Sequence, residues 1–197
     1  MLDKKELKTL RMKQLLFVNG TLLLWFTFFF GLIFMFDVST RIFFIVIAVI
    51  LAVDGLFTIT GKKKVAGMGG WVPSMKKIIA YEREKMGDEW RKSSKNNGIW
   101  SIVLSGLMLF QAWMARSGDT FSFALDRTNI IFFSSLVLVL LLVINGTTLY
   151  HNWKVDRSDS QEDFKGYTKK MNLIGIGIGV LVGYVLIIVI INLVAPL

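Results

Sequence analysis

The sequence predicts an all-α fold, a polytopic integral membrane protein with five transmembrane helices. Of its 197 residues, 54% are hydrophobic and 19% are charged, whereas a soluble domain is about 45–50% apolar and about 25% charged. Five apolar runs reach the roughly 18–20 residues with which a helix crosses a hydrocarbon core of about 30 Å. The charged residues lie almost entirely between these runs. Together these observations predict a single membrane domain over residues 1–197.

The first two runs are expected to form a helical hairpin. They extend over residues 15–36 and 42–60, so that only five residues separate them. A connection this short places two consecutive helices side by side in opposite directions. The first run is also longer than the roughly 7–15 apolar residues of a secretory signal, and we therefore interpret it as a retained span.

The remaining runs are expected to give a second hairpin and a separate C-terminal helix. They extend over residues 98–115, 129–150 and 171–195. The last run contains Gly175, Gly179 and Gly183, and their four-residue spacing places them on one helix face. Such small residues let a neighbouring backbone approach closely in lipid. The pattern predicts a glycine zipper that packs against a helix of this chain or of a second chain, although a flexible gating helix would look the same.

The distribution of basic residues predicts the orientation of the chain in the membrane. Twenty of the 23 Lys and Arg residues lie before residue 15, in residues 61–97 or in residues 151–170. Cytoplasmic segments carry such an excess, so the N-terminus is expected inside and the C-terminus outside. The expected location is the cell membrane, as a multi-pass protein. Because insertion accounts for most of the net charge of +9, nucleic acid is not expected as a partner.

Residues 61–97 form the longest segment between spans and are expected to lie in the cytoplasm. An amphipathic helix is predicted from about Pro73 to Trp90, with the proline in its first turn. Its apolar side is imperfect, because Glu82 and Glu89 fall on or near it. Three interpretations are open: a helix in the headgroup plane, a docking surface for a partner, and a solvated linker. The apolar side consists of Met75, Ile78, Ile79, Met86 and Trp90.

Residues that follow the second span are expected to contact the membrane surface. Lys62, Lys63 and Lys64 would attract anionic lipid headgroups by about 1 kcal/mol per charge, or they simply flank the span as a stop-transfer signal. Trp71 and Trp90 would lie at the interface, where amphipathic indole rings are common. A lipid bilayer with anionic headgroups is therefore one expected partner.

A polar layer is predicted across the first four spans, with Thr58, Ser101 and Ser105 as further candidate members. Asp54 is an acid inside a span, and such groups face protein or water and have a partner. The tripeptide Asn-Gly-Thr occurs twice at a similar depth, at residues 19–21 and 145–147. These groups would bind a cation, relay a proton or hold a polar substrate, or else they form hydrogen bonds that only fix helix packing. The predicted site consists of Asp54, Asn19, Thr21, Asn145 and Thr147.

Enzymatic and metal-binding functions are not expected. The chain contains no cysteine and a single histidine, His151, so neither a thiolate site nor a multi-histidine metal site can be assembled. No zinc-protease, serine-hydrolase or phosphate-loop motif occurs in the sequence. His151 is interpreted as an interfacial residue beside Tyr150 and Trp153. We therefore expect no catalytic residue, no metal and no cofactor.

Two hypotheses for the function follow from these patterns. The first is a non-enzymatic accessory, regulatory or protective (immunity-type) subunit that acts through helix packing with another membrane protein or with a second copy of itself. The alternative is a small transporter, or an ion- or proton-coupled permease, that uses Asp54 together with Asn19 and Asn145.

Overall fold

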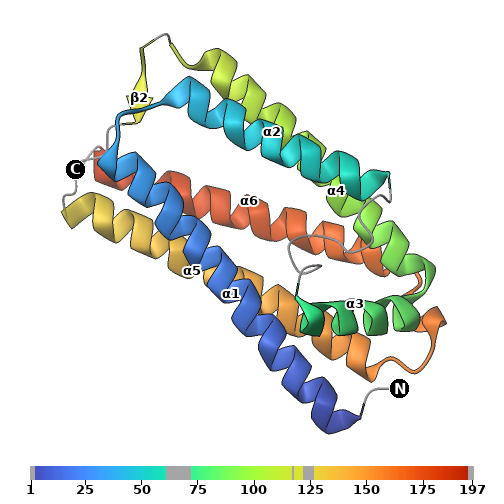
Figure 1. Ribbon diagram of the computed structural model, residues 1–197. Coiled ribbons are helices and arrows are strands. Elements are labelled where there is room, and N and C mark those ends of the chain that lie inside the picture. The colour runs from blue at the N-terminus through green and yellow to red at the C-terminus, as the bar shows by residue number, and fades with distance from the viewer. Residues whose placement is uncertain (1–2, 61–71, 117, 122–126, 195–197) are drawn as a thin grey trace.

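The structure is a computed structural model that describes residues 3–60, 72–116, 118–121 and 127–194. These residues form long helices joined by short connections (Figure 1). A two-residue strand before α2 pairs antiparallel with one after α4, with Val38 opposite Phe121. In chain order the elements are α1 (Lys4–Met35), β1 (Val38–Ser39), α2 (Thr40–Ile59), α3 (Pro73–Met86), α4 (Asp88–Met114), β2 (Thr120–Phe121), α5 (Arg127–Arg157), the short helix η2 (Gln161–Phe164) and α6 (Tyr167–Val194).

The predicted all-helical architecture is confirmed, and four helices are long and apolar enough to cross a membrane. Within the described residues these are the segments Lys4–Ile33 of α1, Thr40–Ile59 of α2, Asp88–Met114 of α4 and Asn129–Arg157 of α5. The fifth predicted span, residues 171–195, falls on α6 except for residue 195, which lies outside the described part of the chain, and α6 is not among these four segments. The count of five and the orientation therefore remain predictions.

Several helices extend well beyond the apolar runs on one side of the predicted membrane. Helix α1 begins at Lys4 instead of Leu15, and α4 begins at Asp88 instead of Gly98. Hydropathy marks only the apolar part of a helix, and the polar residues that continue it follow helix propensity. As a consequence, residues 88–97 of the predicted cytoplasmic loop are the first turns of α4.

A glycine divides the amphipathic helix that the sequence predicts over residues 73–90. Helix α3 ends at Met86, and Gly87 has a φ of +57°, a conformation that favours glycine. A Cβ atom at Gly87 would also collide with the side chain of Gln161. The chain turns sharply at this residue, and Trp90 belongs to α4.

Helices α2 and α4 form the tightest helix pair and lie side by side along their length (Figure 1). The buried residues of the contact are small and recur every seven positions, at Ala48 and Gly55 on α2 and at Gly98, Ser105 and Ala112 on α4. A seven-residue period keeps one face of each helix toward its partner. The Ser105 hydroxyl donates a hydrogen bond of 2.8 Å to the Ala48 carbonyl oxygen. Small side chains thus bring the two backbones into contact.

The best-buried apolar cluster lies at the end of the molecule where α3 crosses the other helices (Figure 1). It contains Met86, Val155, Phe164 and Tyr167, which come from α3, α5, η2 and α6. We call this end the head; it comprises α3, η2 and the adjoining ends of α1, α4, α5 and α6. In contrast, only 6% of the apolar window of α1 and 0% of that of α5 is buried within the protein. Helices α1, α3, α4, α5 and α6 therefore meet in the head, and apart from the α2–α4 pair their membrane-length parts bury few residues.

The apolar side of α3 is covered by the protein itself. Met75, Ile78 and Met86 are buried, and α3 contacts α1, α4, α5 and η2. This arrangement differs from the expectation of a helix in the headgroup plane, because the surface that would enter the membrane is already occupied. It equally leaves no room for a docking partner on these three side chains.

Candidate functional site

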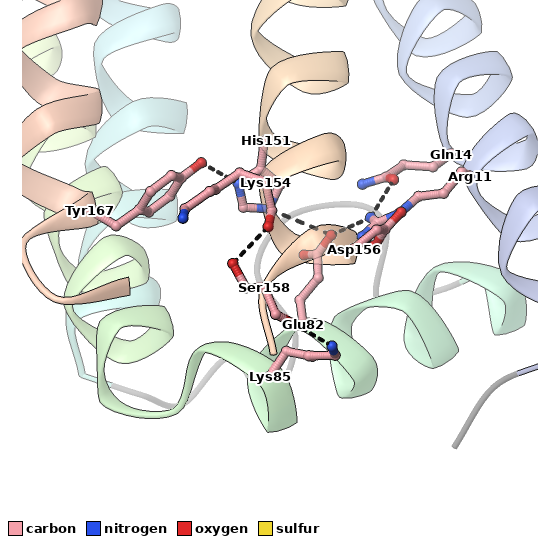
Figure 2. Close-up of polar contacts among 9 residues, drawn as sticks. All are labelled: Arg11, Gln14, Glu82, Lys85, His151, Lys154, Asp156, Ser158 and Tyr167. Atoms are coloured by element: carbon pink, nitrogen blue, oxygen red, sulfur yellow. Dashed lines mark hydrogen bonds and ion pairs between the residues drawn. The ribbon is translucent and has the colours of Figure 1, made fainter. Parts of the chain in front are cut away.

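A buried arginine at the centre of the head joins three helices. Arg11 on α1 is 8% exposed and donates one hydrogen bond, from Nη1, to Glu82 on α3 (Figure 2). It also binds Asp156 on α5 in bidentate fashion, with Nε–Oδ2 and Nη2–Oδ1 distances of 3.2 and 2.7 Å. Gln14 accepts a further bond of 3.0 Å from its Nη1 atom. Charge-assisted, forked contacts of this kind are among the strongest in proteins, so Arg11 fixes α1, α3 and α5 relative to one another.

His151 connects this ion-pair network to α6. Its Nε2 atom lies 3.6 Å from a carboxylate oxygen of Glu82, and its Nδ1 atom lies 2.8 Å from the hydroxyl oxygen of Tyr167 (Figure 2). Both ring nitrogens of His151 therefore have a polar neighbour, one on α3 and one on α6, and the ring links the two helices.

Burial and neighbouring charges set the protonation states of Tyr167 and Glu82, the two partners of His151. Burial raises the pKa of Tyr167 well above its usual range, so its hydroxyl stays protonated and can donate to His151. For Glu82 burial also acts to raise the pKa, but the interactions with His151 and Arg11 outweigh it and the pKa is lowered. Glu82 is thus a buried, ionised carboxylate at neutral pH.

Two glutamates organise the head: Glu82 lies on the apolar side of α3, and Glu89 lies at the start of α4. Glu82 lies one helical turn from both Ile78 and Met86, and it is buried with them. Glu89 accepts hydrogen bonds from the backbone N–H and the hydroxyl of Thr168, at 3.2 and 2.9 Å, where α6 begins. The two acids that interrupt the apolar pattern therefore each bind a different helix, and together they organise the head.

A cavity of about 760 Å³ opens beside this network, between α1, α4, α5 and α6. Glu82, His151 and Tyr167 line one end of it. From there it extends along the membrane-length parts of α4 and α6, where its walls include Trp100, Leu104, Ile174 and Gly179. Polar groups of the head and apolar groups of the spans thus line a single space.

Two of the predicted polar residues meet within the spans. Asn19 on α1 and Asn145 on α5 form a reciprocal amide pair, with N–O distances of 3.0 and 2.9 Å. Thr147 donates back to its own helix, to the Val143 carbonyl oxygen, and Thr21 is half-buried on α1. Asp54 is half-buried on α2, where its carbonyl oxygen accepts a 2.8 Å bond from the hydroxyl of Thr58.

A second amide pair has the same form but lies nearer the head. Asn96 on α4 and Asn172 on α6 exchange hydrogen bonds of 2.7 and 3.0 Å. Each pair satisfies one donor and one acceptor of both amides inside an otherwise apolar helix contact. The pairs fix the register of α1 against α5 and of α4 against α6.

We expect the Asn19–Asn145 pair to contribute measurably to stability. In a double-mutant cycle with Asn19→Leu and Asn145→Leu, the coupling energy should be about 0.6 kcal/mol and at most about 1.7 kcal/mol, as for other hydrogen bonds within membranes. Thermal unfolding in detergent would measure it. Asn19→Leu with Thr147→Val serves as the control cycle, because Thr147 bonds its own helix. A coupling energy for the amide pair no larger than that of the control would contradict this assignment.

The structure places the other predicted site residues as follows. At Gly175, Gly179 and Gly183 an added Cβ would meet no described atom within 4 Å, and Gly175 and Gly179 line the cavity. Trp90 packs against the apolar cluster of the head. Lys62, Lys63, Lys64 and Trp71 lie outside the described residues.

Sequence reasoning missed the network of Arg11, Glu82, Asp156, His151 and Tyr167. The available signal was Glu82 on an apolar helix face, because a buried acid requires a counter-charge. Among the described residues, no three His, Asp or Glu side chains lie close enough together to hold a metal ion.

Comparison with known proteins adds no relative from which a role could be carried over. No family model, no curated protein and no solved structure matches the sequence. The function is therefore inferred from the geometry alone.

Proposed function

We propose that the protein is a non-enzymatic accessory, regulatory or protective (immunity-type) subunit that acts by packing its helices against another membrane protein. The observation that carries this proposal is the unfilled glycine face of α6. A Cβ at Gly179 or Gly183 would meet no described atom within 4 Å, although this spacing suits close contact between helices. A partner helix would fill that face.

The loose packing of the spans supports the proposal. The apolar window of α5 has none of its residues buried, and that of α4, the best buried, reaches 17%. A self-contained bundle turns one stripe of every helix into a common core. Outside the α2–α4 pair, the membrane-length parts instead present free surfaces on which a second protein can pack.

The proposed topology has five spans, with α6 as the fifth, in the cell membrane with the N-terminus inside. Its support is that the three segments rich in Lys and Arg meet at one end of the molecule. Arg11 binds Glu82 and Asp156, and Lys77 binds Glu6 at 2.9 Å, so residues 3–14, α3 and the end of α5 lie together. Segments that share a side of the membrane must share an end of the structure.

The transporter hypothesis receives less support from the geometry. It assigns Asn19 and Asn145 to a substrate or an ion, whereas these two amides bind each other. A hydrogen-bonded pair of this kind fixes helix packing. The subunit hypothesis is therefore preferred over a permease that uses Asp54.

The proposal is tested by purifying the protein from its native membrane in mild detergent and weighing the intact particle. We expect a foreign membrane subunit in stoichiometric amount with the wild type. Gly183→Leu should lower its recovery by about tenfold, which corresponds to about 1.4 kcal/mol of binding free energy. Gly177→Leu is the matched control, because Gly177 lies on the other side of α6 and is equally uncrowded. A particle that contains this chain alone, in both the wild type and the variants, would refute the subunit hypothesis.

A further inference from the structure

We propose that the cavity between α1, α4, α5 and α6 binds one amphiphile with a positively charged ammonium head. The head would lie next to Glu82, and the apolar chain would extend along α4 and α6. The inference rests on the lining of the cavity; Gly179 belongs both to this lining and to the glycine face proposed for a partner helix, so a partner helix is an alternative occupant that the test below distinguishes.

The polarity of the cavity changes along its length in the same direction on α4 and α6. On α4 the lining runs from Ser93 and Asn97 to Leu104, and on α6 it runs from Thr168 to Ile176. On these two helices the hydrogen-bonding groups lie toward the head and the apolar groups follow toward the membrane, whereas α5 contributes Thr147, Thr148 and His151. A molecule that fits this lining has a small polar head and a long apolar tail, which is the composition of an amphiphile.

The charge of the lining favours a cation. Glu82 is the charged residue of this lining, and no Lys or Arg is found among the described residues that form it. Behind Glu82, Arg11 binds both Glu82 and Asp156, and His151 lies 3.6 Å from a Glu82 oxygen within the lining itself. In a chain whose net charge is +9, the lining thus contains a carboxylate and neither Lys nor Arg. An ammonium head is attracted there, and a phosphate or sulfate head is repelled.

An aromatic group at the head end suits an ammonium group in particular. Tyr167 lines the cavity at the same end as Glu82, and the face of such a ring attracts cations that have lost part of their water. The Tyr167 hydroxyl oxygen lies 2.8 Å from Nδ1 of His151, and it can also accept a hydrogen bond from an ammonium N–H.

The glycines of α6 provide the space. Gly175 and Gly179 line the cavity, and neither would have a neighbour within 4 Å of an added Cβ. The volume of about 760 Å³ falls within the range of roughly 300–1,000 Å³ that small-molecule sites occupy. A leucine at Gly175 would extend into this space near its polar end.

The test compares two probes that share a twelve-carbon chain and differ in the charge of the head. Dodecyltrimethylammonium or dodecyl sulfate is added, at the same small fraction of the detergent, to the protein in dodecyl maltoside micelles. Tryptophan fluorescence reports binding, and native mass spectrometry reports stoichiometry. We expect one molecule of the ammonium probe to bind saturably and at least about tenfold more tightly than the sulfate probe. Equal binding of the two probes, or tighter binding of the sulfate, would overturn the proposal.

Variants locate the bound probe. Glu82→Gln keeps the shape of the side chain but removes its charge, and it should weaken binding of the ammonium probe at least about tenfold. Because Glu82→Gln also removes the charge partner of Arg11, Gly175→Leu provides a second test, which fills the cavity and leaves the network intact. Gly177→Leu is the control and should bind like the wild type. Binding that survives Gly175→Leu unchanged would place the probe elsewhere and overturn the proposal.

The natural occupant is identified by the mass that stays with the purified wild type. A retained phosphatidylethanolamine would indicate the ammonium head of a membrane lipid, whereas a lighter basic molecule would indicate a free lipophilic amine. If the cavity instead holds a helix of a partner subunit, Gly175→Leu will lose that subunit, and the wild type will show no saturable binding of the ammonium probe. That result would overturn the amphiphile assignment.

Discussion

Replacing Arg11 by methionine is expected to lower the free energy of unfolding by about 3–5 kcal/mol, because it leaves the carboxylate of Glu82 buried without its counter-ion. Methionine keeps much of the apolar stem, so the loss reports mainly on the charge. The same change frees Asp156, which holds the guanidinium through two hydrogen bonds. Thermal unfolding in detergent, followed by circular dichroism, measures the effect.

An exposed ion pair between α1 and α3 provides the control. Lys77 on α3 binds Glu6 on α1 at 2.9 Å, but their side chains are 62% and 43% exposed. Such pairs contribute about 0–1 kcal/mol, so Lys77→Met should have little effect. If Arg11→Met lowered the free energy of unfolding no more than Lys77→Met does, the buried network would not stabilise the head.

A leucine at Gly55 is expected to destabilise the protein by about 3 kcal/mol, because it forces α2 and α4 apart. An added Cβ at Gly55 would lie 2.8 Å from the carbonyl oxygen of Gly98 and 2.8 Å from Cδ1 of Ile102. The carbonyl belongs to the backbone and cannot move aside cheaply. The change should be visible as a lower unfolding temperature in detergent.

Gly106 offers a matched control on the opposing helix. It lies within the same span of α4, and an added Cβ there would meet no described atom within 4 Å. Gly106→Leu should therefore leave stability nearly unchanged. If Gly55→Leu and Gly106→Leu lowered the unfolding temperature equally, leucine would be destabilising these spans by a route other than the contact of α2 with α4.

The spans were predictable because hydropathy is a local property of the chain. Runs such as 15–36 and 42–60 appear as helices near their expected positions, in α1 and α2. The helix ends were not predictable from hydropathy, because the residues that extend α1 and α4 are polar and contact α3 in the head. The separate break at Gly87 follows from its φ of +57°, a backbone conformation that the apolar pattern over residues 73–90 does not reveal.

The candidate site was predictable only in part. The depth of Asn19 and Asn145 in their spans indicated that they share a layer, and the structure brings them together. Glu82 was visible as an irregularity in an apolar face, but its partner Arg11 lies 71 residues away and no local pattern connects them. A buried charge in a sequence pattern indicates that a partner is required, but the pattern does not identify that partner.

The close contact of α2 with α4 was likewise not predictable from a pattern within one segment of the sequence. The conspicuous glycines at 175, 179 and 183 repeat every four residues on one helix, whereas the contact of α2 with α4 uses small residues spaced by seven on two helices. Neither α2 nor α4 shows the pattern clearly by itself. It becomes evident only when Gly55 is set against Gly98, which requires the pairing to be known.

The anchoring of α6 at one end has a geometric consequence. Helix α6 has 28 residues, so at about 1.5 Å per residue it is a rod of roughly 42 Å held near one end by Tyr167 and Thr168. A tilt of about 5° at that anchor would displace the far end by about 4 Å, given the rise per residue of an α-helix. Small changes in position among Glu82, His151 and Tyr167 would therefore produce larger displacements at the far end of α6.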